Sequence, residues 1–183
     1  MTTVDNASAM DEVKDVDART IVLVGLMGAG KSSVGRRLAA ALNLPFKDAD
    51  TEIEQASNLT IPEFFEIHGE AEFREGERKV ISRLLDGPKH ILATGGGAYM
   101  DPQTRELIRR NGRSVWLRAD LDTLLKRCMK RNTRPLLQQG DPREILDSLM
   151  ESRYPIYAEA DIIVDSSEGP HELVVDKIIQ SLK

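Results

Sequence analysis

The chain of 183 residues is long enough for one domain with a buried core and too short for two ordinary domains. Its 40% hydrophobic and 30% charged residues are typical of a soluble globular protein, and the net charge of -5 argues against duplex nucleic acid as a partner. The only cysteine, Cys128, excludes an internal disulfide and a cysteine-rich metal site.

The first 19 residues contain no apolar core and are acidic rather than arginine-rich, so we predict a disordered tail over 1–19 and no targeting segment. No apolar run approaches the roughly 18 residues that a membrane span requires. Three histidines without metal-ligand spacing are expected to be ordinary surface or hydrogen-bonded side chains: His68, His90 and His171. We therefore expect a cytoplasmic monomer without a membrane partner, with one folded domain over 20–183.

Five apolar segments are predicted to be strands, and helical patterns lie between them. The predicted strands are 20–25, 44–50, 90–95, 114–119 and 161–166, and the predicted helices are 31–43, 70–87, 101–112 and 120–131. Helix boundaries are marked by Asn43, Asp101, Gly112 and Asp120. Strands that alternate with helices predict an α/β fold, here a central five-stranded parallel sheet with helices on both faces.

Residues 132–144 interrupt this alternation. They carry two prolines, a glycine and two glutamines between predicted helices. This composition is typical of a loop rather than of a packed connection, so we predict a mobile lid over 132–144.

The first predicted strand leads directly into a glycine-rich loop and a helix. Gly25 is followed after four residues by Gly30, Lys31 and Ser32, which is the spacing and the context of a P-loop. Backbone N–H groups of such a loop and of the helix N-terminus attract phosphate oxygens. We expect Lys31 to reach the β and γ phosphates of a nucleotide and the Ser32 hydroxyl to ligate Mg2+.

Two carboxylates lie at the C-terminal end of the second predicted strand, at the edge of a parallel sheet where ligands bind. Asp48 is a candidate to hold a water molecule on Mg2+, and Asp50 to accept a proton from a substrate hydroxyl. Alternatively, Asp50 is the N-cap of a following helix, a role that does not exclude the catalytic one.

Two further features need an explanation. Arg74 lies on a predicted helix rich in glutamate and is suited to bind a planar carboxylate, although an arginine in such a helix more often pairs with a neighbour on the solvated face. Gly95, Gly96 and Gly97 form an uninterrupted run, which is costly because glycine loses much conformational freedom on folding. No lysine follows them at P-loop spacing, so the run does not predict a second phosphate site.

Six motifs occur in the order GLMGAGKSSVGRRLA, DAD, GEAEFREGE, LATGGGA, TRPLL and ESRYPIYAEAD. Together they resemble the shikimate kinase family, small P-loop enzymes of the nucleoside monophosphate kinase-like group, from about Thr20 to the end of the chain. The resemblance implies a three-layer P-loop kinase fold with substrate-binding helices over about 50–86 and a lid over 132–144. It also implies an ATP-dependent enzyme that phosphorylates the 3-hydroxyl of shikimate in chorismate and aromatic amino-acid biosynthesis.

The resemblance further implies roles for individual residues. The catalytic residues would be Lys31, Asp50 and Arg134, with Asp50 as the base and Arg134 on the lid. ATP would be bound by Gly28, Ala29, Gly30, Lys31, Ser32, Ser33, Arg127 and Arg134, with Arg127 near the adenine. Shikimate would be bound by Asp50, Arg74, Gly95, Gly96, Gly97 and Arg153, with both arginines on its carboxylate. Mg2+ would be held by Ser32 and, through water, by Asp48.

Two departures and two alternatives accompany this interpretation. Ser33 stands where threonine is commoner, and residues 165–172 contain no lysine or arginine, so we assign no adenine contact there. A kinase of another small hydroxy acid, such as gluconate, would share the P-loop and the lid. A non-catalytic binding module would share the fold, although the presence of Lys31 and Asp50 argues against it.

Overall fold

The computed structural model describes residues 18–131, 135–166 and 169–183. The tail predicted over 1–19 lies outside these residues except for 18 and 19, and Arg134 lies outside them as well. Within the described residues, no helix is both long and apolar enough to cross a lipid bilayer.

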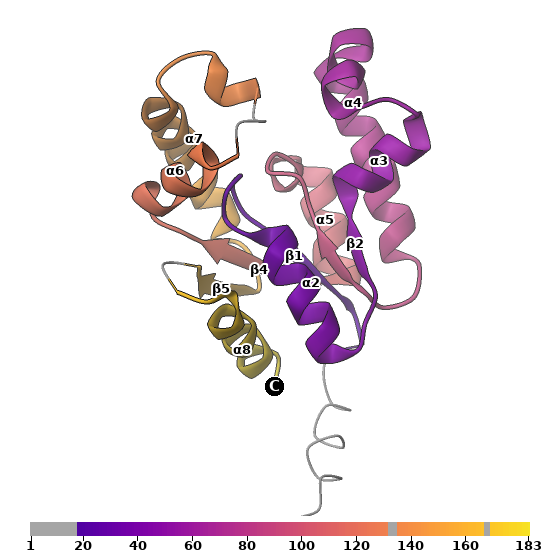
Figure 1. Cartoon of the computed structure of the whole chain (residues 1–183). Coiled ribbons are helices and arrows are strands. Elements are labelled where there is room, and N and C mark those ends of the chain that lie inside the picture. The colour runs from indigo at the N-terminus through magenta and orange to yellow at the C-terminus, as the bar shows by residue number, and fades with distance from the viewer. Residues whose placement is uncertain (1–17, 132–134, 167–168) are drawn as a thin grey trace, which may run out of the picture.

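A five-stranded sheet forms the centre of the molecule (Figure 1). All neighbouring strands pair in parallel in the order β2-β3-β1-β4-β5. The five residues of β1 are fully buried, as expected for the middle strand of a sheet with both faces covered. The strands are β1 (Thr20–Val24), β2 (Phe46–Asp48), β3 (Ile91–Ala93), β4 (Gly112–Arg118) and β5 (Ile162–Asp165).

Helices complete the three predicted layers. α2 (Lys31–Leu42) and α8 (His171–Leu182) pack together on one face of the sheet, and α5 (Pro102–Asn111) packs against β4. Two further helix pairs lie on the right and on the left of Figure 1: α3 (Ala49–Ser57) with α4 (Ile61–Leu85), and α6 (Leu121–Met129) with α7 (Pro142–Tyr157). The 3-10 turns are η2 (Ala98–Met100) and η3 (Pro135–Gln138). The predicted α/β fold is therefore confirmed.

Most of the predicted helix boundaries are confirmed by their capping geometry. Asn43 ends α2 in the left-handed conformation, at φ 52°. The side chains of Asp101 and Asp120 accept backbone hydrogen bonds from Gln103 and Thr123 at the starts of α5 and α6.

Three boundaries differ from the prediction. α4 has an additional first segment that begins at Ile61, where Thr60 and Glu63 form a capping box. The backbone is not helical at Gly69, at φ 80°, so the predicted start at residue 70 is the start of the second segment. Asp50 is not the N-cap of α3: Asp48 caps it, since its side chain accepts from the backbone N–H groups of residues 50 and 51. α7 starts at Pro142, so residues 142–144 of the predicted lid are helical.

Candidate active site

The P-loop owes its shape to three glycines with positive φ. Gly25, Gly28 and Gly30 have φ angles of 147°, 82° and 95°, which side-chain-bearing residues rarely adopt. After Gly30 the chain enters α2 at Lys31, so the N–H groups of the first turn of α2 have no carbonyl partners within the helix. The loop and the helix N-terminus thus present donors to an anion.

Polar side chains connect the P-loop to β2. Lys31 Nζ donates to the carbonyl oxygens of Gly25, at 2.6 Å, and Leu26, at 2.9 Å. Ser32 Oγ donates to Asp48 Oδ2 at 3.0 Å. The predicted lysine, hydroxyl and first carboxylate therefore lie together at one edge of the sheet.

Asp50 lies in the first turn of α3 and not at the end of the strand. Burial raises the pKa of its carboxyl above the ordinary value, the neighbouring Asp48 raises it further, and Lys31 and Arg74 oppose the shift. A carboxylate whose pKa is raised holds a proton more readily than an exposed one, which suits a general base.

The three consecutive glycines follow β3, and none of them has a positive φ. Instead, their lack of side chains lets atoms of other residues lie close to the backbone of the loop. A Cβ atom on Gly95 would lie 2.9 Å from Asp50 Oδ1, and one on Gly97 would lie 2.9 Å from Cζ of Arg74. A Cβ atom on Gly96 would meet Arg153 Nη1 at 3.4 Å, within tight van der Waals contact.

The glycine loop 95–97 therefore brings together a carboxylate and two guanidinium groups from α3, α4 and α7. Gly96 is also close to the P-loop, since a Cβ atom on it would lie 3.7 Å from the backbone nitrogen of Met27. The sequence prediction placed these groups in one site, and the structure brings them together.

Glu77 belongs to this group although sequence reasoning did not single it out. Its side chain is 1% exposed and accepts from Arg74 Nη1 at 2.7 Å. Burial raises its pKa to about 7, against the lowering effect of Arg74. A glutamate three residues after Arg74 on the same helix was the available signal, because such spacing places both side chains on one face.

A cleft of about 650 Å3 extends from Asp50 and Gly96 past the P-loop to the start of α8. Gly28, Gly30, Lys31, Ser32 and Ser33 line it, as predicted for a nucleotide site, and the backbone of Ala29 lies behind them. Neither Arg74 nor Arg153 lines the cleft itself; both are placed by their contacts with the glycine loop.

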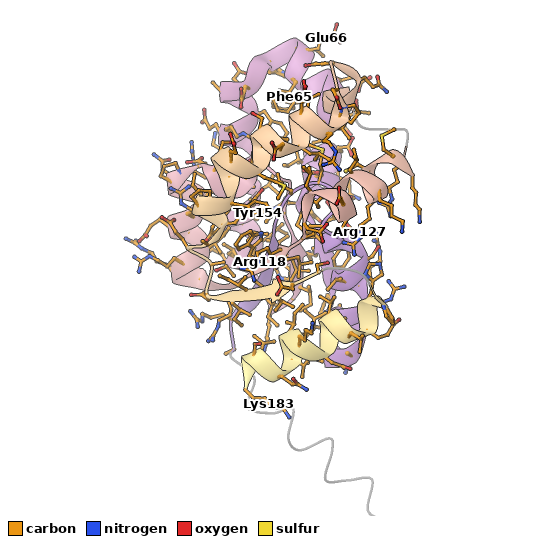
Figure 2. All side chains as sticks on the ribbon, turned by 90° about the vertical axis from the view of Figure 1, so that its left-hand side faces the viewer. Phe65, Glu66, Arg118, Arg127, Tyr154 and Lys183 are labelled. Carbon is orange, nitrogen blue, oxygen red and sulfur yellow. The ribbon has the colours of Figure 1, made fainter. Side chains whose placement is uncertain are left out.

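Arg127, labelled in Figure 2, also lines the cleft. Its Nη1 donates to the carbonyl oxygens of Gly28 and Ala29, each at 3.3 Å, and to Ser166 Oγ at 3.3 Å. It therefore supports the back of the P-loop from α6.

Four titratable cleft residues were missed by the sequence analysis: Lys126, Lys130, Arg131 and His171. The three basic residues come from α6 and the residues after it, and their signal was the repeat of lysine and arginine at four-residue spacing in 126–131. His171 begins α8, far along the chain, and its Cε1 would lie 3.5 Å from a Cβ atom on Gly30. Only the fold brings it to the P-loop.

Comparison with known proteins gives a consistent assignment. The model of the family described as shikimate kinase matches residues 27–183. The shikimate kinase of Paramagnetospirillum magneticum is 65% identical over 164 residues, which are 90% of this chain and 84% of that protein. The shikimate kinase of Caulobacter vibrioides is 51% identical over 173 residues, which are 94% of this chain and 86% of that protein.

Solved structures of shikimate kinases have a similar fold. The shikimate kinase from Acinetobacter baumannii in complex with shikimate has a TM-score of 0.86 and 37% identity, over 93% of this chain and 94% of that one. A gluconokinase from Sinorhizobium meliloti has a TM-score of 0.60 at 20% identity, over 90% of this chain and 91% of that one, which is a likeness of fold alone. The chain belongs to the shikimate kinase family.

Proposed function

We propose that the chain transfers the γ-phosphoryl group of ATP to the 3-hydroxyl of shikimate, giving shikimate 3-phosphate and ADP for chorismate and aromatic amino-acid biosynthesis. The observation that carries this proposal is the convergence of Asp50, Arg74 and Arg153 on the glycine loop beside the P-loop. A small ring with a carboxylate and several hydroxyls matches two guanidinium groups, one carboxylate and backbone N–H donors.

ATP is assigned to the long cleft. The backbone of Gly28–Ser33 would surround the phosphates, with Lys31 exchanging its loop carbonyl partners for phosphate oxygens. The basic side chains of Lys126, Lys130 and Arg131 add positive charge along the same cleft. Arg127 would hold the P-loop and line the nucleotide cleft next to the start of α8.

The oxygen ligands beside the P-loop fit Mg2+. This ion prefers hard oxygen ligands and keeps several waters, so it requires few side chains. In the described ranges no three acidic, histidine or cysteine side chains form a metal cluster, which is compatible with a site completed by water and phosphate oxygens. Ser32 would ligate the ion directly and Asp48 through water, starting from the 3.0 Å contact between their oxygens. When bound, Mg2+ neutralises charge on the phosphates.

Shikimate is assigned to the space beside the glycine loop 95–97. Arg74 and Arg153 would bind its carboxylate and thereby orient the ring. Glu77 holds Arg74 from the buried side through the 2.7 Å ion pair. The absence of a side chain at Gly96 would let the ring approach the backbone beside Arg153 and the P-loop.

The transfer step follows from this placement. Asp50 accepts the proton of the 3-hydroxyl, the hydroxyl oxygen forms a bond to the γ-phosphorus, and the bond to the β–γ bridging oxygen breaks so that ADP leaves. Lys31 stabilises the negative charge on the phosphoryl oxygens. We assign the same role to Arg134 on a lid over about 132–141, which would also exclude water as a competing acceptor.

We further propose that residues 20–183 form one domain that acts as a cytoplasmic monomer. The single sheet and the core that extends from β1 to α8 support the single domain.

The substrate is tested by measuring ADP release from ATP and Mg2+ with shikimate, gluconate or a nucleoside monophosphate as the sole acceptor. We expect turnover with shikimate and none above background with the other two, because only shikimate combines a ring hydroxyl with a carboxylate in the required arrangement. Turnover confined to gluconate or to the nucleotide would contradict the proposed substrate. Binding of shikimate without ADP release would identify a binding module.

Asp50→Asn tests the base, because the amide keeps the size of the side chain but cannot accept the proton. We expect turnover to fall at least about a hundredfold and the affinity for ATP to change less than about twofold. Steady-state ADP release and titration with a fluorescent nucleotide measure the two quantities. Glu52→Gln, on the same helix but paired with Arg83, is the control and should keep normal turnover. Near-normal turnover in Asp50→Asn would remove the base assignment.

Glu77→Gln tests the buried ion pair through the pH dependence of stability. Because the pKa of Glu77 is raised from 4.5 to about 7 on folding, the folded state binds the proton more tightly than the unfolded state. The resulting stabilisation is complete below about pH 4.5 and is lost as pH rises to about 7.

Urea unfolding at pH 5, 6, 7 and 8 measures this effect. Relative to Glu77→Gln, the wild-type free energy of unfolding should fall by on the order of 1–3 kcal/mol between pH 5 and pH 8. Glu75→Gln, which changes an exposed glutamate of the same helix, should follow the wild-type pH curve. Parallel curves for wild type and Glu77→Gln would show that Glu77 does not titrate in this range.

A further inference from the structure

The last turn of α7 contacts the glycine loop through a residue that the proposed reaction does not use. The hydroxyl of Tyr157 donates a hydrogen bond to the carbonyl oxygen of Gly96. Arg153 lies four residues earlier on α7, one helical turn away, and its guanidinium approaches the α-carbon of the same glycine. Helix α7 therefore bonds Gly96 through the Tyr157 hydroxyl and places the Arg153 guanidinium beside the same residue.

The carbonyl oxygens of the glycine loop have different partners. The oxygens of Gly95 and Gly97 accept backbone hydrogen bonds from Ala98 N at 3.2 Å and Met100 N at 3.1 Å. The oxygen of Gly96 accepts from the side chain of Tyr157. The middle peptide of the loop is thus held by a tertiary contact, while its neighbours are held by local turns.

The tyrosine is itself held rigidly. Its side chain is 1% exposed and its ring stacks on Trp116, with ring centroids 5.8 Å apart, and on Tyr99, at 6.2 Å. Burial raises the pKa of Tyr157 to about 12, so its hydroxyl stays protonated at physiological pH and remains a donor. These contacts fix the position from which the hydroxyl reaches Gly96.

We propose that Tyr157 is a positioning residue for the acceptor substrate, acting by fixing the peptide between Gly96 and Gly97. In a planar trans peptide the N–H group points opposite to the carbonyl. Holding the Gly96 oxygen therefore also sets the direction of the Gly97 N–H. Without Tyr157 the peptide loses its partner and is free to rotate, since glycine on both sides opposes rotation only weakly.

This inference rests on the proposed function, which places shikimate against Gly96. It assigns Tyr157 an effect on shikimate alone, because its hydroxyl contacts the glycine loop and Arg153, both assigned to shikimate, and not the P-loop. A residue needed only for general folding would affect both substrates and the thermal stability together.

Tyr157→Phe removes the hydroxyl and keeps the stacked ring. Tyr154→Phe is the matched control: Tyr154, labelled in Figure 2, lies on the same helix and packs on the same tryptophan, but its hydroxyl donates to the carbonyl oxygen of Ala119. Each change removes one hydroxyl donor to a backbone oxygen, and only one of these oxygens belongs to the glycine loop.

The test compares KM values for shikimate and for ATP in wild type and both variants. For Tyr157→Phe we expect the shikimate KM to rise on the order of two- to tenfold, the range for loss of one hydrogen bond, with the ATP KM unchanged. Tyr154→Phe should leave both KM values unchanged. Titration of shikimate followed by the fluorescence of Trp116, the only tryptophan, gives the dissociation constant without turnover.

The outcomes separate this inference from the proposed function. If wild type does not phosphorylate shikimate, the proposed function fails and the positioning role fails with it. If wild type does so and Tyr157→Phe has an unchanged shikimate KM and dissociation constant, only the positioning role is overturned. Equal rises of both KM values, or equal effects of the two variants, would also overturn it by indicating a general structural role.

Discussion

Side chains from three separate elements can meet in this molecule only because the glycine loop 95–97 has no side chains of its own. The carboxylate of Asp50, from α3, lies close to Gly95. The guanidinium of Arg153, from α7, lies close to Gly96, and that of Arg74, from α4, lies close to Gly97. A methyl group at the first or the last of these positions would overlap the carboxylate or the guanidinium. The absence of side chains from the loop is therefore the constraint on which the proposed shikimate site depends.

The two glycine-rich loops of the chain contain glycine for different physical reasons. In the P-loop the glycines adopt positive φ angles and direct backbone N–H groups toward an anion. In the loop 95–97 no φ is positive, and the glycines provide space. The loops lie side by side at the carboxyl edge of parallel strands, so the proposed phosphate site is close to the proposed hydroxyl site.

Features with a local cause could be predicted from the sequence. The strands follow from apolar β-branched runs, and the ends of α2, α5 and α6 follow from Asn43, Asp101 and Asp120. The P-loop follows from its spacing. The roles of the substrate residues are implied by the resemblance to a family and stay predictions. The first segment of α4 was missed although its capping box of Thr60 and Glu63 is a local signal. Two features with a tertiary cause were also missed: the burial of Glu77 and the contact of His171 with the P-loop. Their positions depend on packing between segments that are distant in the chain.

Gly96→Ala tests the central claim most directly, because the φ of residue 96 is not positive and the added methyl group would have no contact closer than 3.4 Å. The variant should therefore fold normally while the methyl group occupies the space assigned to the ring. Calorimetric titration of shikimate and of ATP into wild type and Gly96→Ala provides the measurement. We expect at least a tenfold loss of shikimate affinity, about 1.4 kcal/mol, with ATP affinity retained. Unchanged shikimate affinity in the folded variant would contradict the account.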